Sequence, residues 1–307
     1  MRVSVVTPAY NQAEFLEETI LSVLAQDYPD LEYVVVDDGS TDGSAEIVER
    51  YADRLHWWTR QENAGQVAAI NRGFEHTTGD LMAYLNSDDT FLPGAVSEMV
   101  TEFEANPELV MVYGDALYTD PDSNRTGYLT SRPWDPPTMV MNCDNHVVQP
   151  SSMWTRRAWE QAGPFDERGY YFFDFEFYLR LSALGPVRRV PKPWSTYRLH
   201  PTSKSEGDQR EKARDQLRFA DAFLTSERLP DALRPYVRQG RASARVAAAN
   251  NIYREFELGR ARRWLLEAFV LQPQSMSRLS LSLVGKSLLP RSVVRRLRER
   301  RRAAHRG

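Results

Sequence analysis

The chain has few of the features that place a protein outside the cell or within a membrane. It contains a single cysteine, Cys143, which excludes an internal disulfide and a zinc site built from several cysteines. No window approaches the ~20 consecutive apolar residues of a membrane-spanning helix. The first residues lead directly into a predicted strand rather than into a signal peptide. We therefore expect a cytoplasmic protein.

A strong net charge is also absent, but the charges are unevenly distributed. The formal net charge is -3 at pH 7, whereas residues 291–307 contain eight arginines and one glutamate. A narrow apolar stripe among these arginines favours peripheral docking of the tail on an anionic surface at the inner face of the cell membrane. A solvated basic tail explains the same residues equally well. Nucleic-acid binding is not expected, because neither a known binding fold nor interleaved aromatic residues accompany the arginines.

Short apolar runs, each ending on polar residues, divide the first part of the chain. Runs typical of buried strands lie at residues 2–8, 31–36, 55–60, 81–85 and 109–115. Segments typical of helices lie between them, at residues 13–26, 44–51, 63–73 and 93–105. Alternating strands and helices predict an α/β fold with a Rossmann-like, mostly parallel sheet flanked by helices.

The end of the fourth predicted strand carries the strongest chemical signal. The apolar run from Leu81 stops abruptly on Asn86, Ser87, Asp88 and Asp89. In an open α/β sheet the carboxyl ends of the strands face the ligand, and closely spaced carboxylates there suit a divalent cation bound to a phosphate. An acidic turn that caps the next helix explains the same residues. From these residues alone, both interpretations stay open.

Two further segments are candidates for nucleotide binding. Asp37 and Asp38 directly follow the second predicted strand, where carboxylates accept hydrogen bonds from the base and ribose of a nucleotide. The small residues between Asn63 and Gly73 allow a helix N-terminus to approach a phosphate closely. They equally allow tight packing of a helix against the sheet, so this segment has two interpretations.

A second group of candidates lies later in the chain. Asp174 and Glu176 are surrounded by aromatic residues at the start of a predicted helix, where burial raises the pKa of a carboxylate and the helix dipole opposes that rise. Such an acid suits proton transfer, although Glu176 is also explained by a purely electrostatic role. Arg198, His200 and Lys204 then bring three cationic side chains into a short loop, where they suit a diphosphate. A surface hydrogen-bonding role explains His200 as well.

Four motifs resemble one known family in sequence, order and spacing. They are Thr7-Pro8-Ala9-Tyr10-Asn11, Val36-Asp37-Asp38-Gly39-Ser40-Thr41-Asp42, the segment 63–73, and Asn86-Ser87-Asp88-Asp89. Together they resemble the nucleotide-sugar half of family 2 glycosyltransferases of the GT-A fold. The resemblance continues through a Gly-Pro-Phe-Asp-Glu loop at residues 163–167, in the acceptor half, and extends to about residue 205.

The resemblance implies a donor site for a nucleoside-diphosphate sugar, such as a UDP-, dTDP- or GDP-sugar. The donor-binding residues that it implies are Thr7, Pro8, Tyr10, Asp37, Asp38, Asn63, Gly65, Asn71, Asn86, Asp89 and Arg198. Asp88 corresponds to the principal ligand of a Mn²⁺ or Mg²⁺ ion, with Asn86 and His200 as further candidates. Asn86 departs from the usual Asp-X-Asp pattern, because an amide replaces the first acid and carries less charge to the metal.

In the acceptor half, the resemblance implies that Asp174 is the catalytic base of an inverting transfer. Glu176 is the alternative base. Phe173 is a second departure, because the family has a glutamate at that position. We predict a glycosyltransferase domain at residues 1–205, with a nucleotide-sugar half at about 1–105 and an acceptor half at about 106–205. A helical region with a basic tail is predicted at residues 206–307, and an irregular excursion at residues 118–145.

The sequence thus predicts a metal-dependent, inverting hexosyltransferase-like enzyme. It would move a sugar to a hydroxyl of a saccharide or lipid-linked acceptor in the synthesis of a cell-surface polysaccharide or glycolipid. A catalytically inactive sugar-nucleotide-binding or scaffold protein is one alternative, compatible with Asn86 and Phe173. A nucleotidyltransferase is disfavoured, because the first loop, residues 7–12, has none of the glycine, lysine or arginine of a phosphate-binding loop.

Overall fold

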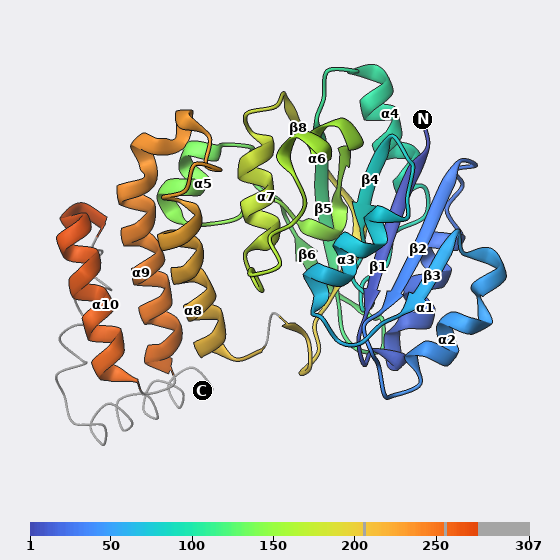
Figure 1. Cartoon of the computed structure of the whole chain (residues 1–307), viewed down its shortest axis with the longest axis horizontal. Coiled ribbons are helices and arrows are strands. Elements are labelled where there is room, and N and C mark those ends of the chain that lie inside the picture. The colour runs from blue at the N-terminus through green and yellow to red at the C-terminus, as the bar shows by residue number, and fades with distance from the viewer. Residues whose placement is uncertain (205–206, 255–256, 276–307) are drawn as a thin grey trace. The chain divides into compact units, whose positions relative to one another are not determined.

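The computed structural model describes residues 1–204, 207–254 and 257–275 of the chain. The chain divides into two compact units (Figure 1), one made of Met1–Asp135 and Asn145–Glu206 and the other of Pro136–Asp144 and Gly207–Gly307. Residues 136–144, which the sequence groups with the first predicted domain, belong to the second unit. The basic stretch 291–307, with its predicted membrane docking, lies outside the described residues. In the described part of the chain, no helix combines the length and the apolar character needed to cross a bilayer.

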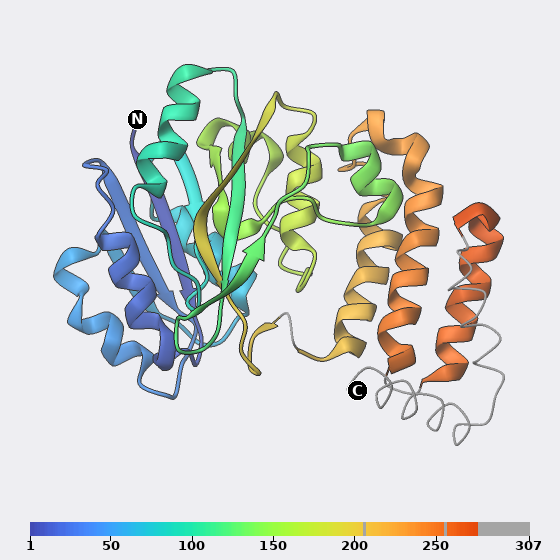
Figure 2. The same cartoon turned by 180° about the vertical axis from the view of Figure 1, so that it is seen from behind.

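Among the described residues, the first unit is built on an eight-stranded sheet. The strands are β1 (Val3–Ala9), β2 (Leu31–Asp37), β3 (Trp57–Arg60), β4 (Leu81–Tyr84), β5 (Met111–Thr119), β6 (Arg125–Leu129), β7 (Ser152–Thr155) and β8 (Val187–Arg198). Their order is β3-β2-β1-β4-β7-β5-β6, and β8 pairs with β5 in parallel. In the view from behind, β5 in green and β8 in yellow lie side by side (Figure 2). Strands β1 to β4 are parallel to one another, whereas β7 is antiparallel to both of its neighbours.

Helices cover both faces of this sheet. They are α1 (Ala13–Leu24), α2 (Ser44–Arg50), α3 (Gln66–Glu75), α4 (Ala95–Ala105), α6 (Arg156–Ala162) and α7 (Phe173–Leu181). Successive strand residues point to opposite faces, so Val5 and Val35 pack with α1, α2 and α4, whereas Val6 and Val36 pack with α3, α6 and α7. The predicted fold class, a mostly parallel sheet flanked by helices and followed by a helical region, is confirmed.

The elements that the sequence did not predict lie mainly in the second half of the first unit. Strand β8 contains Pro191 and Pro193 and alternates irregularly between exposed and buried residues. Proline is tolerated there because, among the strands of the described sheet, β8 pairs with β5 alone, with a register shift next to Pro193. On its other side, β8 forms an isolated bridge between Ser195 and Phe91. A strand of this kind has no clear apolar alternation, so the sequence pattern did not reveal it.

The predicted irregular excursion at residues 118–145 is wrong in part. Strand β5 continues to Thr119, β6 follows at Arg125–Leu129, and the helix α5 spans Pro136–Asn142. Strand β6 lies at the edge of the sheet and is mostly exposed, so it lacks the apolar alternation of a half-buried strand. The two prolines that begin α5 resemble a loop in sequence, but proline is tolerated in the first turn of a helix.

The second unit is helical in its described residues. It contains α5, α8 (Gln209–Arg218), a π-helical turn (Phe219–Phe223), α9 (Val237–Arg254) and α10 (Leu258–Leu271). Small residues such as Ala248, Ala249 and Ala261 let α8, α9 and α10 pack closely around Ile252 and Leu265. Helices are therefore found in the described part of the predicted C-terminal helical region.

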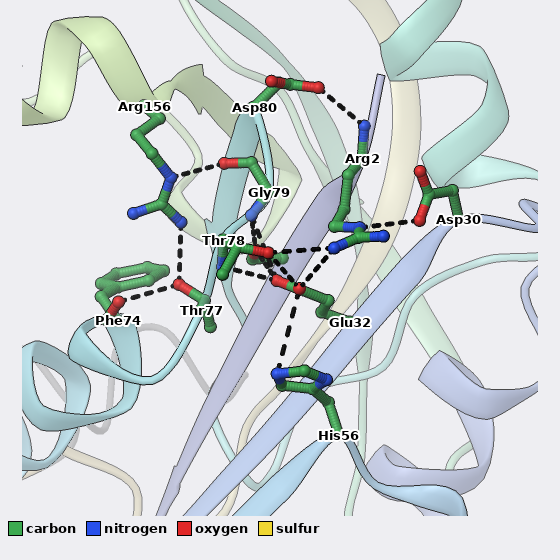
Figure 3. Close-up of polar contacts among 11 residues, drawn as sticks. Arg2, Asp30, Glu32, His56, Phe74, Thr77, Thr78, Gly79, Asp80 and Arg156 are labelled. Atoms are coloured by element: carbon green, nitrogen blue, oxygen red, sulfur yellow. Dashed lines mark hydrogen bonds and ion pairs between the residues drawn. The ribbon is translucent and has the colours of Figure 1, made fainter.

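A buried carboxylate fastens the amino ends of β1, β2 and β4 (Figure 3). Glu32 accepts hydrogen bonds from the hydroxyl of Ser4 (2.8 Å) and from the hydroxyl and amide of Thr78 (2.5 and 2.7 Å). The amide of Gly79 and the guanidinium of Arg2 also contact the carboxylate, at 3.1 and 3.3 Å, and Nε2 of His56 lies 3.9 Å from it. Burial alone would raise the pKa of Glu32, but the hydrogen bonds from Thr78 and Ser4 outweigh it and lower the pKa to about 2.

Candidate active site

The predicted donor-binding residues follow neighbouring parallel strands. In the register of the sheet, Ala9 at the end of β1 lies beside Asp37 at the end of β2, and Val6 of β1 lies beside Tyr84 at the end of β4. The loops after these strands therefore meet at one edge. This edge is the carboxyl edge, where ligands of open α/β sheets bind.

Asp38 organises the loop that follows β3. Its Oδ1 accepts hydrogen bonds from the side-chain amide of Gln61 (2.7 Å) and the backbone amide of Ala64 (2.9 Å), and its Oδ2 accepts one from the amide of Gly65 (2.8 Å). Gly39 has a φ of +81°, and a Cβ there would lie 3.0 Å from the backbone nitrogen of Asn63. Only glycine allows the two loops to approach this closely. Asp38 thus brings the predicted residues Asn63 and Gly65 to the carboxyl edge.

Asp37 is fully buried beside this loop. Its Oδ1 accepts a hydrogen bond from the amide of Ser40 (3.2 Å), and its Oδ2 lies 3.3 Å from the guanidinium of Arg60. Arg60 in turn donates to the carbonyl of Ser40 (2.6 Å). Asp37 therefore fixes the turn after β2.

The end of β1 differs from the prediction in detail. Thr7 and Pro8 are buried within the strand, and the Thr7 hydroxyl accepts a hydrogen bond from Tyr33 (3.0 Å). Tyr10, by contrast, is 47% exposed. Asn11 adopts a positive φ of 51° and its side chain accepts from the amide of Thr41 (2.8 Å), so it ties the first loop to the second. Asparagine is one of the few residues that adopt this backbone conformation readily, which is a signal for such a role.

The metal-ligand candidates Asp88 and His200 lie together. The Nε2 atom of His200 is 3.0 Å from Oδ2 of Asp88, and Nδ1 of His200 is 2.9 Å from the hydroxyl of Thr202. The imidazole side chain is 2% exposed and packs on the ring of Phe15. A carboxylate and an imidazole nitrogen fit a divalent ion whose remaining ligands are diphosphate oxygens and water. Among the described residues, no cluster of three or more His, Cys, Asp or Glu side chains forms a metal site by itself.

Asp89 and Arg198 have positions different from those expected of ligand-facing groups. Asp89 is buried, and its Oδ1 accepts a hydrogen bond from the amide of Arg198 (2.9 Å). Burial, and then the charge of Asp88, raise the pKa of Asp89 well above its ordinary value. The guanidinium of Arg198 donates to the carbonyls of Asp88 (2.8 Å) and Pro121 (3.0 Å) and pairs with Glu18 (2.5 Å). The side chain of Arg198 therefore holds the loop of Asp88 and Asp89 in place by hydrogen bonds to the backbone.

Asn71 also has an unexpected role. Its side chain accepts a hydrogen bond from the amide of Phe165 (3.2 Å) and donates to the Phe165 carbonyl (3.0 Å) and to Glu167 (3.1 Å). It thus fastens α3 to the loop at residues 163–167. Gly73 of the same helix serves packing, because a Cβ there would lie 2.4 Å from Val6. Close packing of helix against sheet therefore accounts for this end of the segment 63–73.

Asp174 stands at the start of α7 and is partly exposed. Its Oδ1 accepts a hydrogen bond from the amide of Phe175 (2.7 Å), and its Oδ2 accepts one from Asn145 (3.3 Å). Burial, and then the charge of Asp174, raise the pKa of Tyr84 and Tyr178 well above the ordinary value. Asp174 is thus one of the charged groups that act on Tyr84, the last residue of β4.

The alternative base, Glu176, is enclosed by the protein. It is 1% exposed, because two residues after Asp174 the helix has turned by about 200° and directs this side chain to the buried side of α7. An acceptor hydroxyl needs direct contact with its base, or contact through one water. The geometry therefore favours Asp174 over Glu176.

The fold is an open α/β sheet whose polar loops meet at the carboxyl edge. The model of the family "Glycosyl transferase family 2" matches residues 4–161. The chain therefore belongs to glycosyltransferase family 2.

Curated relatives include proteins of different lengths. The chain is 32% identical over 199 residues to chondroitin synthase of Escherichia coli. The matched region covers 62% of this chain but only 28% of that protein. It is 27% identical over 282 residues to an uncharacterized glycosyltransferase of Nostoc sp., alr2836, covering 86% of this chain and 84% of that protein. The chain thus corresponds to a small part of the first relative and to most of the second.

Two solved structures share the fold. S. aureus TarS in complex with UDP-GlcNAc has a TM-score of 0.65 at 18% identity, over 93% of this chain and 84% of that one. The mannosyltransferase PcManGT from Pyrobaculum calidifontis, in complex with GDP-Man and Mn²⁺, has a TM-score of 0.60 at 19% identity, over 92% of this chain and 78% of that one. The GT-A fold implied by the sequence is confirmed by these neighbours.

Proposed function

We propose that the protein is a metal-dependent, inverting glycosyltransferase that moves a sugar from a nucleoside-diphosphate sugar to an acceptor hydroxyl. The observation that carries the proposal is that the Asp88–His200 pair and the Asp38-organised loop both follow parallel strands at the carboxyl edge of a family 2 sheet. Sugar nucleotides in the TarS and PcManGT structures support a donor of this class.

In the proposed reaction, Asp37 and Asp38 keep the nucleotide-binding loops in place. Asp88 and His200 would hold a Mn²⁺ or Mg²⁺ ion, which neutralises charge on the departing diphosphate. Asp174 takes the proton of the acceptor hydroxyl on Oδ2, while the hydroxyl oxygen forms a bond to the anomeric carbon. The bond from that carbon to the diphosphate breaks, and the diphosphate leaves with the electron pair. Attack from the opposite side inverts the anomeric centre.

The acceptor is proposed from relatives alone. The resemblance to chondroitin synthase of Escherichia coli supports a saccharide acceptor and a role in the synthesis of a cell-surface polysaccharide. A lipid-linked acceptor belongs to the same proposal, as does a cytoplasmic location with contact to the membrane. The glycosyltransferase domain is proposed to be residues 1–205, with residues 206–307 as an accessory helical region.

A direct test is turnover of sugar nucleotides. UDP-, dTDP- and GDP-sugars are incubated with the protein and Mn²⁺ or Mg²⁺, and release of the nucleoside diphosphate is measured with and without EDTA. We expect release from at least one donor, and its loss in EDTA. Asp88→Ala should abolish metal-dependent donor binding in calorimetry while leaving the fold intact, because the side chain is partly exposed at the edge of the sheet.

Undiminished donor affinity of Asp88→Ala in the presence of Mn²⁺ would reject Asp88 as the metal ligand. Donor binding without turnover, across a panel of saccharide and lipid-linked acceptors, would favour the catalytically inactive protein instead.

A further inference from the structure

Side chains from four separate segments form one continuous chain of hydrogen bonds at the carboxyl edge of the sheet. Lys204 Nζ donates to Gln66 Oε1 (2.6 Å), and Gln66 Nε2 donates to Asn86 Oδ1 (2.7 Å). Asn86 Nδ2 donates to Gln149 Oε1 (3.2 Å), and Gln149 Nε2 donates to the carbonyl oxygen of Tyr84 (2.9 Å). We call this set of contacts the amide chain. It joins the start of α3, the end of β4, the turn before β7 and the segment after β8.

The direction of every hydrogen bond in the amide chain is fixed by its two ends. The ammonium group of Lys204 can only donate, and the carbonyl of Tyr84 can only accept. Gln149 must therefore present its Nε2 to Tyr84 and its Oε1 to Asn86. Asn86 then has to donate on one side and accept on the other, which an amide does and an ionised carboxylate cannot do.

An acid at position 86, which the family usually has, would not fit this arrangement. A carboxylate in place of the Asn86 amide would face Gln149 Oε1, and two acceptors would oppose each other. If Gln149 turned over to donate to the carboxylate, its Oε1 would face the Tyr84 carbonyl instead. Either arrangement leaves an acceptor without its donor, which is costly in a partly buried site.

The second departure from the family pattern lies at the other end of the amide chain. Lys204 Nζ is 4.0 Å from the ring centroid of Tyr170 and 5.1 Å from that of Phe173. These are cation–π distances, and a glutamate at 173 would replace this aromatic contact with an ion pair. Phe173 directly precedes Asp174. The residues at 86 and 173 are thus connected through Lys204, which links the end of β4 to the helix of the proposed base.

We propose that Asn86 and Phe173 are positioning residues that hold Lys204 at the active site, and that Asn86 is not a ligand of the metal. Lys204 follows His200 by four residues, so the amide chain places its positive charge on the segment that carries a metal-ligand candidate. That Lys204 faces the diphosphate of the donor rests on the proposed function.

The first test measures nucleotide affinity without metal. UDP, dTDP and GDP are titrated in EDTA by calorimetry, and the tightest binder is used. Gln149→Glu, which cannot donate to Tyr84, and Lys204→Met should each weaken binding about fivefold, the effect of one hydrogen bond. The double variant should be no weaker than the single ones, because the amide chain is already broken. Gln161→Glu, the same substitution at an exposed position of α6, should stay within about twofold of the parent.

Additive effects of Gln149→Glu and Lys204→Met would overturn the proposal, since a general loss of structure adds without coupling. Asn86→Asp, which restores the family's acid, gives the opposite expectation from a metal-ligand role. It should weaken nucleotide binding in EDTA about fivefold and leave Mn²⁺ affinity, measured by electron paramagnetic resonance with nucleotide present, unimproved. Mn²⁺ binding tightened about tenfold with full nucleotide affinity would show that Asn86 stands in a ligand position.

The amide chain is also tested independently of any ligand. Gln149→Glu, Lys204→Met and the double variant are unfolded in urea, and their midpoints are compared. If none of the nucleotides binds to the parent protein, the proposed function fails. The double-mutant cycle of unfolding midpoints then tests the amide chain alone. Less than additive destabilisation supports it, and strict additivity contradicts it.

Discussion

Glu32 is expected to stabilise the first unit through its charge. The substitution Glu32→Gln keeps the size of the side chain but removes the carboxylate that accepts from Ser4, Thr78 and Gly79. The site lies at the amino ends of the strands, opposite the candidate active site. Its effect is therefore expected in stability and not in nucleotide binding.

The magnitude follows from the pKa of Glu32. The side chain is 6% exposed, and its pKa falls from the ordinary value of 4.5 to about 2. At about 1.4 kcal/mol per pH unit, this corresponds to about 3 kcal/mol at pH 7. A carboxyl whose pKa is lowered in the folded state stabilises it above the unfolded pKa and loses this contribution as the pH falls through the folded one. The loss should therefore occur between about pH 5 and pH 2.

The assay is urea denaturation of parent and variant at pH 7, 5, 4 and 3, with unfolding monitored by tryptophan fluorescence. The chain has seven tryptophans, and all except Trp264 lie in the first unit, so the signal reports mainly on that unit. The variant should be less stable by about 3 kcal/mol at pH 7, and the difference should narrow by about 2 kcal/mol at pH 3. Glu49→Gln, at an exposed position of α2, serves as the control.

A difference that stays constant within about 0.5 kcal/mol across this pH range would refute the reasoning. It would mean that the substitution acts through packing or through the unpaired amides alone, and that the ionisation of Glu32 does not differ between the folded and unfolded states.

Two further pairs of substitutions test the active-site geometry. An asparagine at position 174 cannot accept a proton, so Asp174→Asn should lower kcat for sugar transfer by about 10²–10⁴ while donor affinity is unchanged. Glu176→Gln should lower kcat far less, because Glu176 is enclosed by the protein. If steady-state kinetics showed the larger fall in kcat for Glu176→Gln, Glu176 would be the base. Arg198→Met removes a buried guanidinium that donates to three backbone carbonyls and pairs with Glu18. Its free energy of unfolding in urea should therefore fall by about 2–4 kcal/mol. Arg125→Met, on the exposed edge strand β6, should leave the free energy of unfolding almost unchanged. Equal stability of the two arginine variants would contradict the assigned role of Arg198.

The parts of the fold that local sequence pattern encodes were predicted well. Strands β1, β2 and β4 are buried on both faces, so each is a mainly apolar run that ends where its polar loop begins. Asp38, Asp88 and Asn86 could be placed at the carboxyl edge for the same reason, because a strand delivers the residues that follow it. Edge strands such as β6 and β8 are exposed along part of their length and lack this signal.

The roles of individual side chains were harder to predict, because their partners are distant in the chain. Arg198 carries a charge next to a His-containing loop, which suggested a phosphate contact. Its guanidinium instead pairs with Glu18, 180 positions away. Asn71 lies in a donor-half motif, yet its partners are 94 and 96 positions further on. Sequence spacing within a motif cannot show which of its polar groups the protein itself uses.

Asp38 illustrates how the protein and a ligand share one polar group. A carboxylate has about four acceptor positions. Three hydrogen bonds from the loop after β3 reach this carboxylate in the described structure. A nucleotide that bonded to Asp38 would therefore either take the remaining position or displace Gln61, whose side-chain amide is the more easily moved donor. The backbone amides of Ala64 and Gly65 would keep the loop in place in both cases. Under the proposed function, the same acid would shape the loop and also contact a base or ribose.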